Sequence, residues 1–297
     1  MPPLRIEKLV VAGVGLIGGS FALALKQAGV VGRVVGLGRT RRSLERAVDL
    51  GVIDEAADDA GAALANADLV MLAMPVGQTA AVLARIASHL GPGAVVTDAG
   101  STKRDVIDAA RATLAGAFPR FVPGHPIAGA ETSGADAARA ELFRGRKTVL
   151  TPVPETDPRA AALVAAAWRA CGADVREMPA DEHDRVFAAV SHLPHLLAFA
   201  LVHDVAAQPN AATLFDYAAS GFRDFTRIAS SHPEMWRDIC IANRESLDAA
   251  LARYQSELES LRRLLAAGDA EAIERIFGEA RDARNAWLAR IESGERK

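Results

Sequence analysis

The sequence predicts an α/β fold: a doubly wound parallel sheet (Rossmann-like) followed by an all-α C-terminal domain. Three observations support this. Apolar runs of strand length alternate with helical patterns through residue 178, a glycine-rich turn follows the first of these runs, and the strand pattern disappears after Pro179. A chain of 297 residues has the length of two domains, which we place at residues 1–178 and 179–297.

The first domain alternates predicted strands with predicted helices. Nearly continuous apolar runs indicate strands that are buried on both faces, as in a parallel sheet with crossover helices. The expected strands are 8–12, 33–37, 69–73, 94–97, 147–151 and 174–178, and helices are expected near 20–28, 43–50, 79–89, 102–114 and 158–171.

The second domain is predicted to consist of helices. Pro233 is expected to begin a long helix, because proline is tolerated in a first helical turn, and an apolar stripe from Trp236 to Leu265 recurs at helical spacing. Gly268 and Asp269 end this helix, and a last helix follows. The stripe must be buried within the domain or against a second copy, so we expect a homodimer that forms through this domain.

Composition and charge exclude several classes of protein. Half of the residues are hydrophobic and 24% are charged, which is typical of a globular chain. The formal net charge is −3, and the only local basic cluster is Arg39, Arg41 and Arg42, so we expect no nucleic-acid partner. The uncharged stretch of residues 9–25 contains four glycines, and the first residues do not form a signal peptide. We therefore expect a cytoplasmic protein without a membrane partner.

A glycine fingerprint follows the first predicted strand. Gly13, Gly15 and Gly18 form a G-x-G-x-x-G pattern in which Leu16 and Ile17 fill the last two variable positions before a predicted helix. Gly13 permits a tight turn, Gly15 lets the backbone approach a pyrophosphate, and Gly18 lets helix and strand pack closely. The helix N-terminus supplies N–H groups for the anion, so the pattern predicts a dinucleotide site.

The end of the second predicted strand indicates which dinucleotide binds. An NAD site usually has an acidic residue here that accepts a hydrogen bond from the ribose 2′-hydroxyl, but this chain has Gly38 followed by Arg39, Thr40, Arg41 and Arg42. Guanidinium groups pair with a 2′-phosphate, which a carboxylate would repel. We expect NADP in preference to NAD. The alternative is that the arginines are a solvated helix start and that NAD binds without its usual acid.

Polar residues interrupt the apolar pattern at three segments. Residues 98–103, which include Ser101, follow a predicted strand, at the sheet edge where ligands of such folds bind, although Ser101 or Thr102 could also cap a helix. His125 lies in the second segment, and an imidazole suits proton transfer near neutral pH. His192 and His195 lie three residues apart on one predicted helix face, where Pro194 should kink the helix.

We expect no metal site. His192 and His195 have no third ligand at suitable spacing, and Cys171 and Cys240 lie far apart without a C-x-x-C pattern. Farther along, Arg223 and Arg227 lie near aromatic residues and form a candidate carboxylate clamp, unless they form surface salt bridges with Asp224.

Taken together, these segments resemble the prephenate/arogenate dehydrogenases of tyrosine biosynthesis. The ordered motifs are GVGLIGGS, DAGSTK, GHPIAGAE followed by Ser133-Gly134, SHLPH, and GFRDFTRIA followed by Trp236-Arg237-Asp238. The resemblance runs from Val11 to beyond Asp238. It implies a nucleotide-binding domain, a helical domain that dimerises, and oxidative decarboxylation of prephenate to 4-hydroxyphenylpyruvate or of arogenate to tyrosine. Both substrates fit these residues.

The resemblance also implies roles for individual residues. His125 matches the group that is hydrogen-bonded to the ring hydroxyl and assists its deprotonation, and Ser101 matches a serine beside that histidine and the nicotinamide. Arg227 matches the residue that binds a substrate carboxylate. His192 and His195 would line the substrate pocket, with Glu131 at its mouth.

Two other functions remain open. A dehydrogenase of the β-hydroxyacid or 6-phosphogluconate type shares a similar first domain but uses a catalytic lysine in the helical domain, and this chain has no lysine between Lys147 and Lys297. A non-catalytic NADP sensor would bind the nucleotide without consuming prephenate or arogenate.

Overall fold

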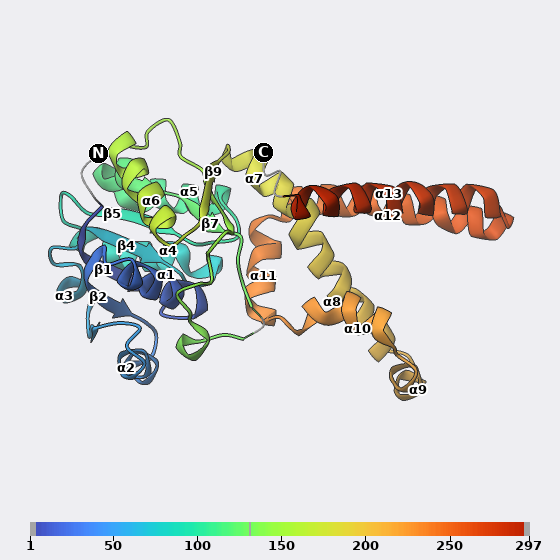
Figure 1. Ribbon diagram of the computed structural model, residues 1–297, viewed down its shortest axis with the longest axis horizontal. Coiled ribbons are helices and arrows are strands. Elements are labelled where there is room, and N and C mark those ends of the chain that lie inside the picture. Colours follow the sequence, from blue (N-terminus) through green and yellow to red (C-terminus); the bar gives the residue numbers. More distant parts are fainter. Residues whose placement is uncertain (1–3, 131, 294–297) are drawn as a thin grey trace. The chain divides into compact units, whose positions relative to one another are not determined.

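The main sheet has six parallel strands. The computed structural model describes residues 4–130 and 132–293 (Figure 1). The strand order is β3-β2-β1-β4-β5-β6. This is the doubly wound arrangement that the sequence predicts. The strands are β1 (Ile6–Ala12), β2 (Val31–Leu37), β3 (Glu55–Ala56), β4 (Leu69–Leu72), β5 (Val95–Asp98) and β6 (Phe121–Val122).

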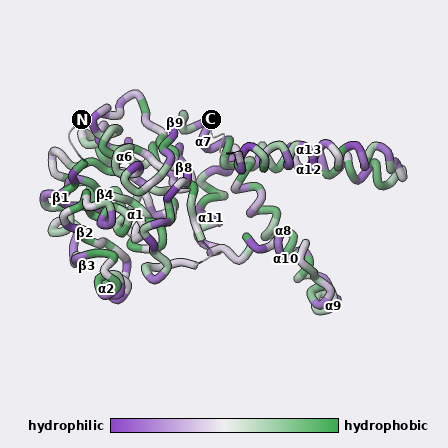
Figure 2. Tube along the Cα trace, in the orientation of Figure 1, coloured by the Kyte–Doolittle hydropathy of each residue, from purple (hydrophilic) through white to green (hydrophobic). Residues whose placement is uncertain are grey.

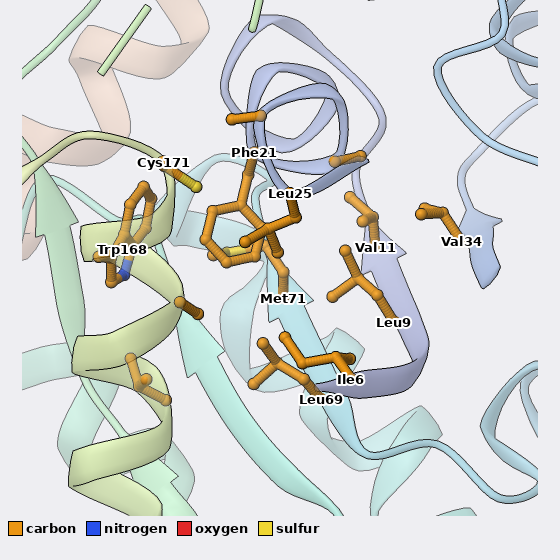
Figure 3. Packing of buried hydrophobic residues seen from close by; sticks show 14 of the residues in the cluster. Ile6, Leu9, Val11, Phe21, Leu25, Val34, Leu69, Met71, Trp168 and Cys171 are labelled. Carbon is orange, nitrogen blue, oxygen red and sulfur yellow. The ribbon is translucent and has the colours of Figure 1, made fainter. Parts of the chain in front are cut away.

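Helices cover both faces of this sheet. One face packs on α1 (Leu16–Gln27), α2 (Arg41–Asp49) and α6 (Pro158–Ala170), where Phe21 and Trp168 meet with ring centroids 4.6 Å apart (Figure 3). The other face packs on α3 (Ala60–Leu64), α4 (Thr79–Ile86) and α5 (Arg104–Leu114). Both faces of the central strands are therefore covered by helices and shielded from water, which explains their continuous apolar runs.

A second, three-stranded sheet corrects one expectation. The runs predicted at 147–151 and 174–178 do not extend the parallel sheet. They form β8 (Lys147–Leu150) and β9 (Asp174–Glu177), which pair with β7 (Gly124–Pro126) in the order β7-β8-β9. β7 and β8 are antiparallel. The chain between them, residues 127–146, forms only turns and one short 3-10 helix in its described part, and no crossover helix is found there.

The chain after residue 179 is helical, as expected. α7 (Ala180–Phe187) continues through a π-helical turn (Ala188–His192) into α8 (Leu193–Ala206), so the irregularity expected near Pro194 is this π turn, and Pro194 itself lies in the first turn of α8. α9 (Ala211–Asp216), α10 (Ser220–Thr226) and a 3-10 turn (Arg227–Ser230) lead to the last helices, and α8 packs against α10 and this turn.

The long helix predicted from Pro233 is two helices. α11 (Pro233–Ala242) ends at Asn243, and α12 (Arg244–Ala267) begins immediately after it. The Asn243 side chain is fully buried and donates a hydrogen bond to the Asp184 carbonyl oxygen at 2.7 Å, so a tertiary contact fixes the break. Trp236 and Ile239 of α11 join the apolar layer on the α4 and α5 face of the sheet.

Two compact units divide the chain at 247/248, and the boundary that we predict after residue 178 remains a prediction. The second unit contains most of α12 and all of α13 (Ala270–Glu292), which form a helical hairpin (Figure 1). Hydrophobic and hydrophilic residues are interspersed along both helices (Figure 2). Several large apolar side chains of this hairpin are exposed: Leu258, Leu265, Phe277, Trp287 and Ile291.

One helical run among the described residues, 180–206, is long and apolar enough to cross a membrane by length and composition alone. Residues 186–203 of this run contain no Asp, Glu, Lys or Arg, so this uncharged stretch is longer than residues 9–25. A core helix of a soluble protein passes the same test, so this is weak evidence for a span.

Candidate active site

The glycine turn has the geometry that a bound dinucleotide requires. Gly13 has a φ of +95°, and a Cβ atom there would lie 2.6 Å from the Ala73 carbonyl oxygen. A Cβ at Gly18 would lie 2.3 Å from the Gly13 carbonyl oxygen, so this glycine permits the close packing of helix and strand. A Cβ at Gly15 would meet nothing within 4 Å, which leaves room for a ligand against the backbone.

The N-terminus of α1 can receive an anion. Gly15 is its N-cap, no side chain caps it, and its first turn has no acidic residue. The N–H groups of Leu16 and Ile17 belong to the first turn, where they lack partners within the helix. These residues fit the pyrophosphate of a dinucleotide, as the sequence predicts.

The basic turn, which comprises Arg39, Thr40, Arg41 and Arg42, follows β2. Thr40 caps α2 by accepting a hydrogen bond from the Ser43 N–H. Arg41 pairs with Glu45 and Asp58. Arg39 and Arg42 are exposed and form no ion pair with any residue in the described ranges. Two of the three guanidinium groups are thus available to a ligand, and the third already has carboxylate partners.

A chain of three hydrogen-bonded side chains begins at His125. β7 carries His125, whose Nδ1 lies 2.8 Å from Nε2 of His183 on α7. The other ring nitrogen of His183, Nδ1, lies 2.8 Å from Oδ1 of Asp184. Phe187 packs against both rings, with centroids 4.8 Å from His125 and 4.5 Å from His183. His125 is thus a strand residue with a defined hydrogen-bond partner.

Asp184 caps α5 from another part of the chain. Its carboxylate accepts hydrogen bonds from the Lys103 N–H at 2.8 Å and from the Arg104 N–H at 3.0 Å. Neither Ser101 nor Thr102 caps this helix, contrary to one expectation, because α5 begins at Arg104 without a local side-chain cap. A negative charge at a helix N-terminus is favourable, so this position stabilises the ionised carboxylate.

A buried ion pair fixes the start of β7. Lys103 and Asp98 contact each other with side chains 0% and 3% exposed. Lys103 Nζ also donates to the Gly124 carbonyl oxygen at 2.7 Å, and Asp98 Oδ1 accepts from the Gly124 N–H at 3.0 Å. Both backbone groups of the residue before His125 are therefore held. We call Asp98, Lys103, His125, His183 and Asp184 the buried polar cluster.

Burial lowers the pKa values of the two histidines of this cluster. Desolvation lowers the pKa of His125 well below its usual value, and His183, Lys103 and His192 lower it further. Desolvation also lowers the pKa of His183, although Asp184 opposes the shift. The pKa of Asp184 is lowered because its hydrogen bonds outweigh the cost of burial. Both imidazoles are therefore neutral near pH 7, and Asp184 is ionised.

The histidines of the third motif lie against Trp236. His195 stacks on the indole at 3.6 Å between centroids, and His192 meets it edge-on at 6.2 Å. His192 is buried, and its Nδ1 lies 3.1 Å from Nδ2 of Asn243. Burial lowers the pKa of His192 to about 4, and the nearby backbone of Ser101 opposes this weakly.

The structure brings most of the predicted site residues together. Ser101 is close to His192, and His192 influences the pKa of His125. Arg227, in the turn after α10, lowers the pKa of His195, although burial lowers it more. Arg223 contacts Asp224 on the surface at 3.5 Å, as the salt-bridge alternative expects. Glu131 lies outside the described residues.

Sequence reasoning missed four residues of this site. His183, Asp184, Lys103 and Asn243 act through contacts with residues far away in the sequence, and only Lys103 falls within a motif that the sequence analysis singles out. Among residues 4–130 and 132–293, no group of three or more His, Cys, Asp or Glu side chains is placed to hold a metal ion.

Comparison with known families gives matches over most of the chain. Residues 21–177 match the family model of the prephenate dehydrogenase nucleotide-binding domain, and residues 179–279 match that of the prephenate dehydrogenase dimerization domain.

Relatives of known function align over nearly the full length. The chain is 38% identical to prephenate dehydrogenase of Bacillus subtilis over 94% of this chain and 76% of the relative. It is 36% identical to cyclohexadienyl dehydrogenase of Zymomonas mobilis over 94% of this chain and 95% of the relative.

Solved structures show the same architecture. Prephenate dehydrogenase from Aquifex aeolicus, in complex with hydroxyphenyl propionate and NAD+, superposes with a TM-score of 0.89 at 36% identity, covering 95% of this chain and 99% of that one. Arogenate dehydrogenase from Synechocystis gives a TM-score of 0.79 at 30% identity, covering 94% and 99%.

Proposed function

The chain belongs to the prephenate dehydrogenase family, and we propose that it catalyses the NADP-dependent oxidative decarboxylation of prephenate, arogenate or both. The products are 4-hydroxyphenylpyruvate and tyrosine, respectively. The observation that carries this proposal is the His125 imidazole, held at the carboxyl end of the sheet beside the buried ion pair, with Ser101, His192, His195 and Arg227 in the same neighbourhood.

His125 is the proton acceptor in this proposal. The ring hydroxyl of the substrate gives its proton to the imidazole while its carbon is oxidised, and a ring carbonyl forms. The carbon–carboxyl bond then breaks, carbon dioxide leaves, and its electron pair makes the ring aromatic. The phenolate oxygen takes the proton back from His125, so the protein ends unchanged. A neutral imidazole is needed for this role, and burial of His125 keeps it neutral.

The cofactor, when bound, accepts the hydride that the substrate carbon loses. The chain's own residues supply the rest. Gly13, Gly15 and the first turn of α1 would bind the pyrophosphate, and Ser101 would lie between the nicotinamide and His125. Arg227 would hold a substrate carboxylate, since a guanidinium group binds that group through two parallel hydrogen bonds.

Two features of the turn after β2 support NADP. Gly38 leaves the position of the usual acidic residue empty, and Arg39 and Arg42 have no carboxylate partner among the described residues. The Aquifex relative is in complex with NAD+, so the comparisons do not indicate NADP. The proposal that this chain prefers NADP therefore rests on its own residues.

We also propose a homodimer formed through the helical domain and a cytoplasmic location. The exposed apolar side chains of α12 and α13 need a partner surface, and the match to the dimerization domain covers residues 179–279. Cys171 and Cys240 are free thiols, as is usual in a reducing compartment.

One set of kinetics tests the function. Initial rates of reduction of NADP and of NAD, each with prephenate and with arogenate, identify cofactor and substrate together. His125→Asn should lower kcat by about 10²- to 10⁴-fold with little change in KM, because it removes the proton acceptor. Arg227→Ala should chiefly raise KM, by about 10- to 100-fold, because it removes a charged anchor. A protein that binds NADP but reduces it with neither substrate contradicts the proposal and fits a sensor.

A further inference from the structure

We propose that His183 and Asp184 are positioning residues that hold His125 in the tautomer with the proton on Nδ1, which leaves Nε2 as the proton acceptor. The inference rests on the proposed function, because it explains how His125 acts as a base. It adds two residues that the motifs do not contain, both on α7.

The argument starts at Asp184, whose carboxylate can only accept hydrogen bonds. Its oxygens receive the N–H groups of Lys103 and Arg104 at the N-terminus of α5, and the Arg104 guanidinium lies 3.4 Å away. These three donors keep Asp184 ionised without a proton from His183.

His183 is then limited to one tautomer. Its side chain is fully buried, and its Nδ1 faces Asp184 at 2.8 Å, so Nδ1 must carry a proton. In a neutral imidazole the other nitrogen is an acceptor. Nε2 of His183 therefore presents a lone pair to His125.

The same reasoning fixes His125. Its Nδ1 lies 2.8 Å from His183 Nε2. Because that nitrogen presents a lone pair, Nδ1 of His125 must donate. Nε2 of the neutral ring is then unprotonated, and it has no hydrogen-bond partner in the described part of the chain. The His125 side chain is also partly exposed, so a substrate can reach this lone pair.

The opposite arrangement requires a charged His183, which would donate from both nitrogens and force the proton of His125 onto Nε2. The groups that act on His183 are Asp184, Asp98, Lys103 and His125, and those that act on His125 are His183, Lys103 and His192. The ammonium of Lys103 and complete burial both disfavour a second positive charge here. Phe187 packs on both rings and opposes their reorientation.

Nitrogen-15 NMR of the ring nitrogens tests the tautomer directly. The holoenzyme is labelled with ¹⁵N-histidine, and the signals of His125 among the seven histidines are assigned with His125→Asn. At pH 7.5 we expect Nδ1 of His125 to show the shift of a protonated nitrogen and Nε2 that of an unprotonated one. The reverse pattern, or an equal mixture, overturns the proposal.

Variants of His183 separate positioning from packing. Glutamine can place an amide oxygen near the position of Nε2 and accept from His125, whereas leucine offers no acceptor. We expect His183→Leu to lower kcat on the order of 10²-fold and to give a tautomer mixture at His125, with KM for both substrates within about 3-fold of wild type. His183→Gln should recover at least about 10-fold of that loss. Equal kcat values for the two folded variants overturn the proposal.

Asp184→Asn tests the end of the chain, with Asp181→Asn as its control. An amide nitrogen at position 184 can donate to His183 Nδ1 and reverse both tautomers, so kcat should fall by about 10²- to 10⁴-fold. Asp181 is on the same helix, is exposed, and lies 3.9 Å from Arg104, so its variant should keep full activity. An Asp184→Asn protein that is folded by circular dichroism and fully active overturns the proposal.

The two proposals fail in different ways. If the wild-type enzyme reduces neither cofactor, the proposed function fails, although the NMR pattern of His125 can still be as expected. If the enzyme is active and His125 carries its proton on Nε2, only the role of His183 and Asp184 fails.

Discussion

The basic turn and the buried polar cluster lie on the same α/β framework, yet their charges are satisfied in opposite ways. In the basic turn, Arg39 and Arg42 point into solvent without a carboxylate among the described residues. In the buried polar cluster, Lys103 and Asp184 meet their partners inside the protein. Charges left unpaired by the protein are suited to select a ligand, whereas charges paired inside it position groups for chemistry. Changes in the two regions should therefore affect different properties.

The largest expected effect is the loss of stability when the buried ion pair is broken. Lys103→Met leaves the Asp98 carboxylate buried without its cation, which should cost about 3–5 kcal/mol of unfolding free energy. Urea denaturation measures this. Arg46→Gln is the control, because the Arg46–Asp136 pair is exposed and its loss should leave the midpoint nearly unchanged. If the urea midpoints of Lys103→Met and Arg46→Gln shift equally, the buried ion pair contributes no more to stability than the exposed one.

Acid should destabilise the protein through its buried histidines before most carboxylates titrate. The pKa of His192 falls from 6.5 in the unfolded chain to about 4 in the folded one, so the unfolded chain binds more protons between these values. Stability is complete above about pH 7.5 and declines as the pH falls below 6.5. His192 alone should contribute a loss of about 2 kcal/mol at pH 5.

Urea midpoints at pH 7.5, 6 and 5 measure this decline. His192→Gln should make the dependence shallower, since glutamine does not titrate. A midpoint that stays constant from pH 7.5 to 5 contradicts the assignment of neutral buried imidazoles.

The smallest effect on stability is expected in the basic turn, where the cofactor should respond instead. Gly38→Asp places an acid directly after β2, and the atom nearest to the added Cβ would be Cδ2 of the Leu44 side chain, at 3.1 Å. The ratio of kcat/KM for NADP to that for NAD should fall by about 10-fold or more, because the carboxylate repels a 2′-phosphate and accepts from a 2′-hydroxyl.

The urea midpoint of Gly38→Asp should stay near that of wild type. An unchanged cofactor ratio with both nucleotides still bound would show that the basic turn does not select the cofactor.

The sequence predicts local features of this protein better than distant contacts. The glycine turn is predictable because Gly13, Gly15 and Gly18 act through their own backbone, next to a strand and a helix that their neighbours define. The main strands are predictable because apolar runs report burial on both faces. The site histidines His125, His192 and His195 fall in motifs that resemble a known family.

Contacts across long sequence separations were not predictable. Fifty-eight residues separate His125 from His183, and 80 separate Arg104 from Asp184, so no local pattern records either contact. The break at Asn243 lies within a continuous apolar stripe and depends on the hydrogen bond to Asp184. The second sheet was missed because its runs have strand character, whereas the antiparallel pairing of β7 with β8 depends on the chain between them.

The cap that Asp184 places on α5 has a consequence for protein engineering. Recombining the first 178 residues of this chain with the remainder of a relative would take α5 from one parent and the residue that caps it from the other. Functional chimeras should therefore require crossover points that inherit α5 and α7 from the same parent. A crossover point that preserves activity would then not lie at the boundary after residue 178, where the sequence changes from strands to helices.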